Sequence, residues 1–314
     1  MRRIVLVSGT SNKPLASKIS DCLEIPLVDP QIRRFANGEI FCEIEENVRG
    51  SDVFIVQPTS APVNDNLMEL LIIIDALKRA SVESITAVVP HYGYSRQDRK
   101  ANPRTPISSK LVADLLTVAG ASRVITMDLH AGQIQGFFNI PFDNLYASPV
   151  FLTYIKNNLN LDNLTLVSPD AGGIERVSWY AKRLEKDIAL IDKRRTAPNV
   201  AKAMNIIGDV EGRDAVIIDD MIDTAGTLIE AAKTLKKNGA NKIYAIATHG
   251  IFSNPAAERI NNCVELEAVI VTDTIPLSKE LKEVEKIKVL SISEILSQSI
   301  HRTFTHDSVS SLFI

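Results

Sequence analysis

The sequence predicts an α/β fold with two similar domains, each a mainly parallel sheet flanked by helices. Short apolar runs rich in β-branched residues alternate with longer segments of helical period, as in βαβ units. The length of 314 residues is about twice that of a typical domain. The content of 45% hydrophobic and 23% charged residues is typical of globular chains and excludes a mainly disordered or fibrous protein.

The first half, predicted to be a domain of residues 1–146, contains four clear apolar runs. These runs predict strands at residues 3–7, 52–57, 84–89 and 123–127. A candidate edge strand lies at 40–45, and periodic segments predict helices at 65–80 and 106–119.

The second half, predicted to be a domain of residues 147–314, repeats this plan. Apolar runs predict strands at residues 164–168, 188–191, 215–219, 242–248 and 268–271. Periodic segments predict helices at residues 173–184, 226–238, 255–261 and 294–301.

Three further features concern the organisation of the chain. The phrases 126–130 and 217–220 are alike, each a strand that ends in a polar loop, which suggests duplication. Residues 142–149 are the candidate linker between the domains. The tail, residues 303–314, ends in three apolar residues and is expected to dock at an interface.

Charge and cysteine content narrow the function classes. A net charge of -3 gives no global attraction to nucleic acid or to an anionic membrane, so neither is expected as a partner. No apolar stretch approaches the roughly 20 residues of a membrane span. Three scattered cysteines cannot build a disulfide framework, and the apolar run at 4–7 is too short for a secretion signal. We therefore expect a cytoplasmic protein.

The most informative stretch is residues 215–227, AVIIDDMIDTAGT. In a parallel sheet, ligands bind beyond the carboxyl ends of the strands. A turn of small residues there can direct backbone N–H groups and hydroxyls at a phosphate, aided by the positive end of the next helix. Asp219 and Asp220 would repel that phosphate, so they suit the hydroxyls of a neighbouring sugar or a divalent cation. The simpler alternative is that the acids end a strand and that Thr224 or Thr227 caps the helix.

This stretch resembles the ribose-phosphate motif of type I phosphoribosyltransferases, and five other segments narrow the resemblance. They are RRFANGEI at 33–40, YSRQDRK at 94–100, TMDLHAGQIQGFF at 126–138, VSPDAGG at 167–173 and DKRR at 192–195. In this order they resemble the ribose-phosphate pyrophosphokinases of the phosphate-activated class. The resemblance runs from Arg3 to the C-terminus and implies two domains of the phosphoribosyltransferase type.

The resemblance implies transfer of a diphosphoryl group from MgATP to the 1-hydroxyl of ribose 5-phosphate, which yields 5-phosphoribosyl 1-diphosphate and AMP. Such a transfer needs alignment and cations more than covalent help. By resemblance, Lys193 and Arg195 belong to a catalytic loop, and His130 and Asp170 hold Mg²⁺. Since Mg²⁺ prefers oxygen ligands, His130 is an unusual ligand that acts directly or through water.

The remaining binding residues are also implied by the resemblance. The ATP-binding residues are Phe35, Asn37, Gly38, Glu39, Arg96 and Gln97. The ribose 5-phosphate-binding residues are Arg195, Asp219, Asp220, Asp223, Thr224, Ala225, Gly226 and Thr227. An aromatic face suits a purine, and a guanidinium suits phosphates. The simpler alternative for Phe35 is packing into its own core.

Regulation is the last expectation from the resemblance. Inorganic phosphate is the expected activator and ADP the expected inhibitor, at a site made of Arg49, Ser81, Arg104, Ser308, Ser310 and Phe313. In this family the segment that contains Phe35 reaches the site of a neighbouring subunit. A homo-oligomer, and by resemblance a hexamer, is therefore expected.

Two other functions are compatible with parts of the sequence. A phosphoribosyltransferase would also use residues 219–227, but it would leave Arg96, Gln97 and His130 without a role and would release pyrophosphate rather than AMP. A catalytically silent regulatory partner would resemble the enzyme without its activity. The presence of Lys193 and Arg195 argues against that alternative.

Overall fold

The computed structural model describes residues 3–194 and 203–313 and divides the chain into two compact units. The first unit comprises the chain up to Tyr146 together with residues 274–276 and 291–314. The second unit comprises residues 147–273 and 277–290. The C-terminal segment is thus grouped with the first unit, whereas the sequence placed all of 147–314 in the second domain. Its helix α9 (Ser293–Thr305) packs on α1 (Lys13–Leu23), where Ser297 Oγ lies 3.4 Å from the Ile19 carbonyl oxygen.

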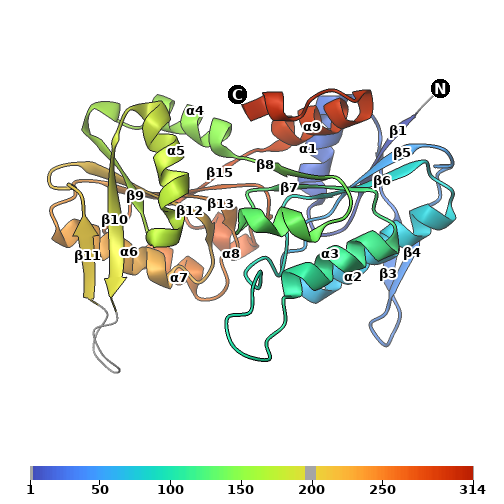
Figure 1. Cartoon of the computed structure of the whole chain (residues 1–314), viewed down its shortest axis with the longest axis horizontal. Coiled ribbons are helices and arrows are strands. Elements are labelled where there is room, and N and C mark those ends of the chain that lie inside the picture. Colours follow the sequence, from blue (N-terminus) through green and yellow to red (C-terminus); the bar gives the residue numbers. More distant parts are fainter. Residues whose placement is uncertain (1–2, 195–202, 314) are drawn as a thin grey trace. The chain divides into compact units, whose positions relative to one another are not determined.

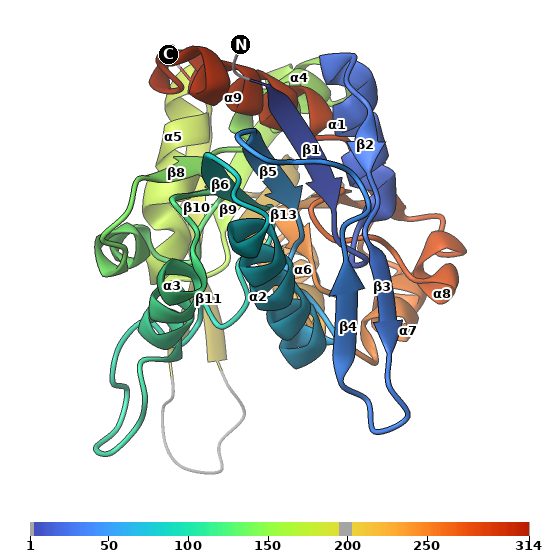
Figure 2. The same ribbon diagram turned by 90° about the vertical axis from the view of Figure 1, so that its right-hand side faces the viewer.

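The first unit is built on a six-stranded sheet with the order β2-β1-β5-β6-β7-β8, and all its pairs are parallel. The strands are β1 (Ile4–Ser8), β2 (Leu27–Val28), β5 (Asp52–Val56), β6 (Ser84–Val89), β7 (Arg123–Met127) and β8 (Phe142–Leu145). Helices α2 (Val63–Arg79) and α3 (Ser108–Ala119) lie on one side of this sheet, and α1 and α9 lie on the other (Figures 1 and 2). An antiparallel hairpin of β3 (Gln31–Arg34) and β4 (Ile40–Glu43) stands apart from the sheet.

The second unit is built on a seven-stranded sheet with the order β11-β10-β9-β12-β13-β14-β15. The strands are β9 (Leu164–Ser168), β10 (Asp187–Arg194), β11 (Ala203–Ile207), β12 (Asp214–Ile222), β13 (Ile243–Gly250), β14 (Ala268–Thr272) and β15 (Ile287–Leu290). The helices are α4 (Ser148–Asn158), α5 (Ile174–Leu184), α6 (Gly226–Lys237), α7 (Ala256–Asn262) and α8 (Lys279–Lys282). Only β11 is antiparallel to its neighbour. The predicted α/β class with two mainly parallel sheets is confirmed.

The predicted linker at 142–149 contains the point where the chain passes from the first unit to the second, after Tyr146, but most of its residues belong to a strand and a helix. Strand β8 occupies the first part of this segment and pairs with β7, and an ion pair of Arg123 with Asp143 joins the two strands. Helix α4 begins at Ser148, with Pro149 in its first turn, where proline is tolerated because no N–H is needed. Of the residues that suggested a linker, Asn144 therefore belongs to strand β8, and Ser148 and Pro149 begin helix α4.

The two units share one topology, and a repeated sequence motif accompanies it. Each central strand, β5 or β12, is preceded by a turn of the form Val-x-Gly-x-Asp, at 48–52 and 210–214. The glycines, Gly50 and Gly212, have φ of 66° and 68°. Their N–H groups donate to the carbonyl oxygens of Ser81 at 2.9 Å and Gly239 at 2.8 Å. The repeated strand order and turn make β12 the equivalent of β5 and not, as the phrases 126–130 and 217–220 suggested, of β7.

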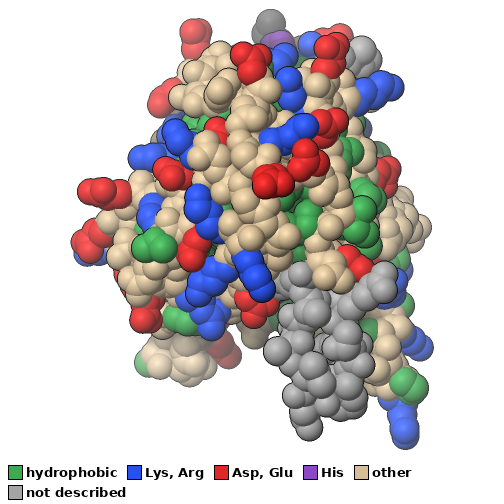
Figure 3. All heavy atoms as spheres, turned by 90° about the vertical axis from the view of Figure 1, so that its left-hand side faces the viewer, with side chains coloured by type: hydrophobic (Ala, Val, Ile, Leu, Met, Phe, Trp, Pro, Cys, Tyr) green, Lys and Arg blue, Asp and Glu red, His purple; other side chains and the backbone are tan. Residues whose placement is uncertain are grey.

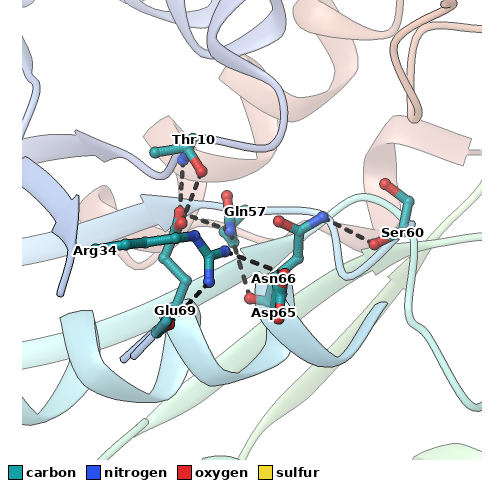
Figure 4. A network of polar contacts seen from close by, with 8 residues as sticks. Thr10, Arg34, Gln57, Ser60, Asp65, Asn66 and Glu69 are labelled. Atoms are coloured by element: carbon teal, nitrogen blue, oxygen red, sulfur yellow. Dashed lines mark hydrogen bonds and ion pairs between the residues drawn. The ribbon is translucent and has the colours of Figure 1, made fainter. Parts of the chain in front are cut away.

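A buried carboxylate closes the carboxyl edge of the first sheet (Figure 4). Glu69 of α2 is 2% exposed and accepts hydrogen bonds from Thr10 N and Thr10 Oγ1 at 2.7 Å and from Gln57 Nε2 at 2.8 Å. Asn66, one turn earlier, donates to the Ser60 carbonyl oxygen at 2.8 Å. Since buried polar groups are costly without partners, this network fixes the loops that follow β1 and β5.

The same helix holds the β3–β4 hairpin. Arg34, the last residue of β3, donates to the Gly38 carbonyl oxygen at 3.2 Å and forms an ion pair with Asp65 at 3.2 Å (Figure 4). Both side chains are about half exposed, so this pair contributes little to global stability. Its position nevertheless connects the tip of the hairpin to the first turn of α2.

We predict that Glu69→Ala lowers the free energy of unfolding by about 1–3 kcal/mol, because the buried amide of Gln57 and the N–H and hydroxyl of Thr10 lose their acceptor. Urea unfolding followed by circular dichroism measures the change. Asp75→Ala is the matched control on the same helix, since Asp75 forms only an exposed ion pair with Arg79. Equal unfolding curves for the two variants would contradict the role of Glu69.

Candidate functional site

The acidic pair of the second unit lies where β12 continues beyond its neighbour β9. The pairing with β9 includes Ile217 opposite Val167, whereas the pairing with β13 continues to Ile222 opposite Gly250. The strand therefore runs three residues beyond its predicted end at 219. Asp219 and Asp220 consequently stand at the carboxyl edge of the sheet, with 33% and 6% of their side chains exposed.

A guanidinium from α5 accompanies this acidic pair. Arg176 NH1 lies 3.5 Å from Asp219 Oδ1 and 3.6 Å from Asp220 Oδ1. Burial, and then the charge of Asp220, raise the pKa of Asp219 to about 7, while Arg176 acts in the opposite direction. Arg176 was missed at the sequence level, because a lone arginine after a glycine pair carries no motif signal.

In the turn at 223–227, the residue that directly precedes α6 is Ala225, whose methyl side chain offers no cap to the helix. Ala225 precedes the helix in the left-handed region, with φ of 58°, and Arg259 of α7 donates to the Thr224 carbonyl oxygen at 2.9 Å. The alternative that Thr224 or Thr227 caps this helix is therefore wrong. The N–H groups and the positive end of a helix start suit an anion.

The loop after β9 lies beside this turn, because β9 and β12 are adjacent parallel strands. Asp170 is exposed, and its Oδ1 accepts a hydrogen bond from Gly173 N at 3.1 Å. A Cβ at Gly173 would meet Ser168 Oγ at 2.9 Å and would displace this hydroxyl, which donates to the Asp170 carbonyl oxygen at 2.7 Å. The second unit thus places Asp170, the acidic pair and the turn 223–227 after the carboxyl ends of two adjacent strands.

The predicted catalytic loop is only partly within the described residues. Lys193 belongs to β10, where its backbone pairs with that of Met204 in β11. Its side chain and the whole of Arg195 lie outside the described residues.

The predicted adenine-binding residues form the tip of the β3–β4 hairpin. Phe35 N donates to the Glu39 carbonyl oxygen at 2.8 Å, and Glu39 N donates to Asn37 Oδ1 at 3.2 Å. Gly38 has φ of 93°, which closes this turn. Phe35 meets the ring of Phe41 edge-on at 6.0 Å but remains 53% exposed, so burial in its own core is wrong.

Arg96 and Gln97 are exposed on the loop after β6. Gln97 accepts at Oε1 a hydrogen bond from Ser108 Oγ, and Ser109 N donates to the Gln97 carbonyl oxygen at 3.2 Å. The exposed His130 follows the adjacent strand β7, and Gln133 from the same segment donates to Asp98 at 2.6 Å. The loops after β6 and β7 therefore lie side by side.

The predicted regulatory residues form groups within the first unit. Arg49 and Ser81 are neighbours, because Gly50 N donates to the Ser81 carbonyl oxygen. In the tail, Arg302 donates to the Ser308 carbonyl oxygen at 2.8 Å, and Phe313 contacts Tyr146 edge-on at 5.6 Å. Arg104 stands on a separate loop in the left-handed region, and Ser310 begins a short 3₁₀ turn.

Residues 3–194 and 203–313 have two properties that concern metal ions and membranes. No three histidine, cysteine or acidic side chains gather closely enough there to hold a metal ion. None of the described helices is long and apolar enough to cross a bilayer. On the face drawn in Figure 3, positive and negative side chains are interspersed.

The sequence and the structure were compared with known proteins. Residues 4–120 match the model of the N-terminal domain of ribose phosphate pyrophosphokinase, and residues 194–314 match that of the phosphoribosyl synthetase-associated domain. Ribose-phosphate pyrophosphokinases of Wolinella succinogenes and Brucella melitensis are 53% and 52% identical, over 100% and 98% of this chain and 100% and 99% of theirs. A crystal structure of phosphoribosylpyrophosphate synthetase from Mycobacterium smegmatis superposes with a TM-score of 0.92 at 40% identity, covering 97% of this chain and 100% of the other. The chain belongs to the ribose-phosphate pyrophosphokinase family.

Proposed function

We propose that the protein transfers the diphosphoryl group of MgATP to the 1-hydroxyl of ribose 5-phosphate, giving 5-phospho-α-D-ribose 1-diphosphate and AMP. The observation that carries the proposal is the helix start that follows two carboxylates at the carboxyl edge of one sheet. Full-length relatives with the corresponding name support it.

The ribose 5-phosphate contacts follow from the chemistry of the second unit. N–H groups and hydroxyls at 223–227 bind the 5-phosphate at the start of α6. Asp219 and Asp220 accept hydrogen bonds from the ribose hydroxyls. The loop at 170–173 receives the diphosphate, since Gly172 and Gly173 permit a close approach of the backbone.

ATP binds through the first unit. The exposed ring of Phe35 stacks on adenine, Asn37 and Glu39 contact its edge, and Arg96 with Gln97 contacts the nucleotide. Lys193 and Arg195 supply the cations that stabilise charge on the transferring group.

Mg²⁺ fits the donors that are present. The exposed carboxylate of Asp170 offers the oxygen ligand that this ion prefers, and His130 adds a nitrogen, directly or through water. A site with few protein ligands agrees with the way Mg²⁺ is usually held, largely by waters and substrate phosphates. When bound, the ion neutralises charge on the phosphates.

Regulation and location complete the proposal. Inorganic phosphate as activator and ADP as inhibitor bind at Arg49, Ser81, Arg104, Ser308, Ser310 and Phe313. The protein works in the cytoplasm without a nucleic-acid or membrane partner. A phosphoribosyltransferase or a silent partner is less well supported, because matches to named pyrophosphokinases cover the entire chain.

The reaction is tested by phosphorus NMR after the protein is mixed with ATP, ribose 5-phosphate, Mg²⁺ and phosphate. We expect AMP and a new diphosphate ester to appear in step. Lys193→Ala is expected to lower turnover about 100-fold or more with little change in ATP affinity, since a cation aimed at developing charge is lost. Lys182→Ala is the control, because it also removes a lysine, and Lys182 is exposed on α5. A folded protein that leaves ATP and ribose 5-phosphate unchanged would contradict the proposal. Release of pyrophosphate from added 5-phosphoribosyl 1-diphosphate and a nucleobase would then indicate a phosphoribosyltransferase, and no release would indicate a silent partner.

The raised pKa of Asp219 predicts a pH dependence of substrate binding. Below its pKa of about 7 the carboxyl is largely protonated and is a poorer acceptor, so affinity for ribose 5-phosphate should rise as pH rises through 7. Apparent KM values from pH 6 to 8.5 measure this effect. Asp219→Asn should keep only the pH dependence that comes from the substrate phosphate. Parallel pH curves for the parent and the variant would rule out this role for Asp219.

We also propose a homo-oligomer, a hexamer by family resemblance. Leu111, Leu115 and Val118 form an exposed apolar stripe on α3, with exposures of 58%, 38% and 78%. Their spacing of four and three residues puts them on one face of the helix. An apolar helix face of this kind is typical of subunit contacts.

We predict that Leu111→Glu with Val118→Glu reduces the mass measured by light scattering, because burying the new charges in a subunit contact is unfavourable. Val264→Glu is the control, since Val264 is 86% exposed on the second unit. An unchanged mass in the α3 variant would exclude this stripe as a contact.

A further inference from the structure

Arg176 stands between two parts of the candidate site in the second unit. It is the third residue of α5, and α5 directly follows the glycine loop at 170–173. Its guanidinium reaches across to Asp219 and Asp220 of β12, and only 26% of its side chain is exposed. Arg176 therefore links the loop assigned to the diphosphate with the acids assigned to the ribose.

The helix itself gives no reason for a cation at this position. The start of a helix carries partial positive charge, so an arginine in the first turn is disfavoured there. Glu175, beside it, is the residue type that the first turn favours. The position of Arg176 is therefore explained either by its attraction to Asp219 and Asp220 or by a ligand that it binds.

The ion pairs of Arg176 are long. At 3.5 and 3.6 Å they exceed the range of good hydrogen bonds, whereas Arg213 donates to Asp187 in the same unit at 2.6 Å. Coulomb attraction holds Arg176 near the carboxylates without committing its forked N–H donors to them. A guanidinium with uncommitted donors suits a phosphate group, which it can bind through two parallel hydrogen bonds.

Residues three apart on a helix are neighbours, so Arg176 borders Gly173 at the start of α5. An anion held by the loop at 170–173 and the positive end of α5 would lie within reach of its side chain. The same guanidinium can then serve the acids and the anion.

We propose that Arg176 is a diphosphate-binding residue: it neutralises Asp219 and Asp220 in the substrate-free site and binds the diphosphoryl oxygens when these enter the loop at 170–173. This inference rests on the proposed function and adds to it a third cation, carried by helix α5, beside Lys193 and Arg195.

The test measures binding of methylenediphosphonate, a stable diphosphate, in the presence of Mg²⁺. Trp179 is the single tryptophan of the chain and lies three residues after Arg176, so its fluorescence reports on this end of α5. Arg176→Gln is expected to weaken diphosphonate binding about 10- to 100-fold, the range for a lost charged hydrogen bond, with a much smaller change in ribose 5-phosphate binding. Arg176→Lys keeps the charge but loses the fork, and should fall in between.

Arg183→Gln is the matched control, because Arg183 belongs to the same helix but stacks over Trp179 at 3.5 Å. Equal loss of affinity for both ligands in Arg176→Gln, or unchanged diphosphonate affinity, would overturn the proposal in favour of a structural ion pair. If Arg176→Gln does not fold, Arg176→Lys decides by the same comparison. Selective loss of diphosphonate binding in a chain that forms no AMP would leave Arg176 assigned and refute the proposed reaction.

Discussion

The structure depends on one constraint: parallel strands deliver all their carboxyl ends to the same edge of a sheet, and every polar group there needs a partner, solvent or a ligand. The first unit meets this constraint internally, because the carboxylate of Glu69 accepts from Thr10 and Gln57 and is closed to solvent. The second unit leaves its edge more open to solvent. A third of the Asp219 side chain is exposed, and the guanidinium of Arg176 lies 3.5 Å from it. An edge left in this state is suited to a ligand.

The duplication makes this contrast specific. The last residues of β1 and β9 are equivalent serines, and the strand registers then place Gln57 where the second unit has Asp219. The helices α2 and α6 end in matching turns, since Val82 N and Ala240 N donate to the carbonyl oxygens of Leu77 and Leu235. Counted back from those ends, Glu69 occupies the position of Thr227. A carboxylate there repels phosphate, so the first unit has lost the anion site that the second unit keeps in the proposed function.

Much of the fold was predictable, because buried central strands are continuous apolar runs. Helix α1 was missed since its polar face carries serines and Pro14, although proline stands in the first turn and Asn12 caps the helix by accepting from Leu15 N. Strand β8 was missed because it is short and carries polar residues, and it is defined by pairing with β7. The candidate site was likewise predictable only in part. Asp219, Asp220 and the turn after them form a local sequence pattern, whereas Arg176 is recognised only by its short distance to the two aspartates in the structure.

By itself the sequence determined the fold class, the two-part plan and the residue types of the ribose-phosphate turn, because these depend on local patterns of apolarity, turn chemistry and spacing. Tertiary structure alone decided which strands are equivalent, which unit keeps an open edge, and which cation faces the acids. Register and burial bring residues such as Arg176 and Asp219 together across 43 positions of the chain. No local pattern encodes such a contact, since it arises from how α5 packs beside β12.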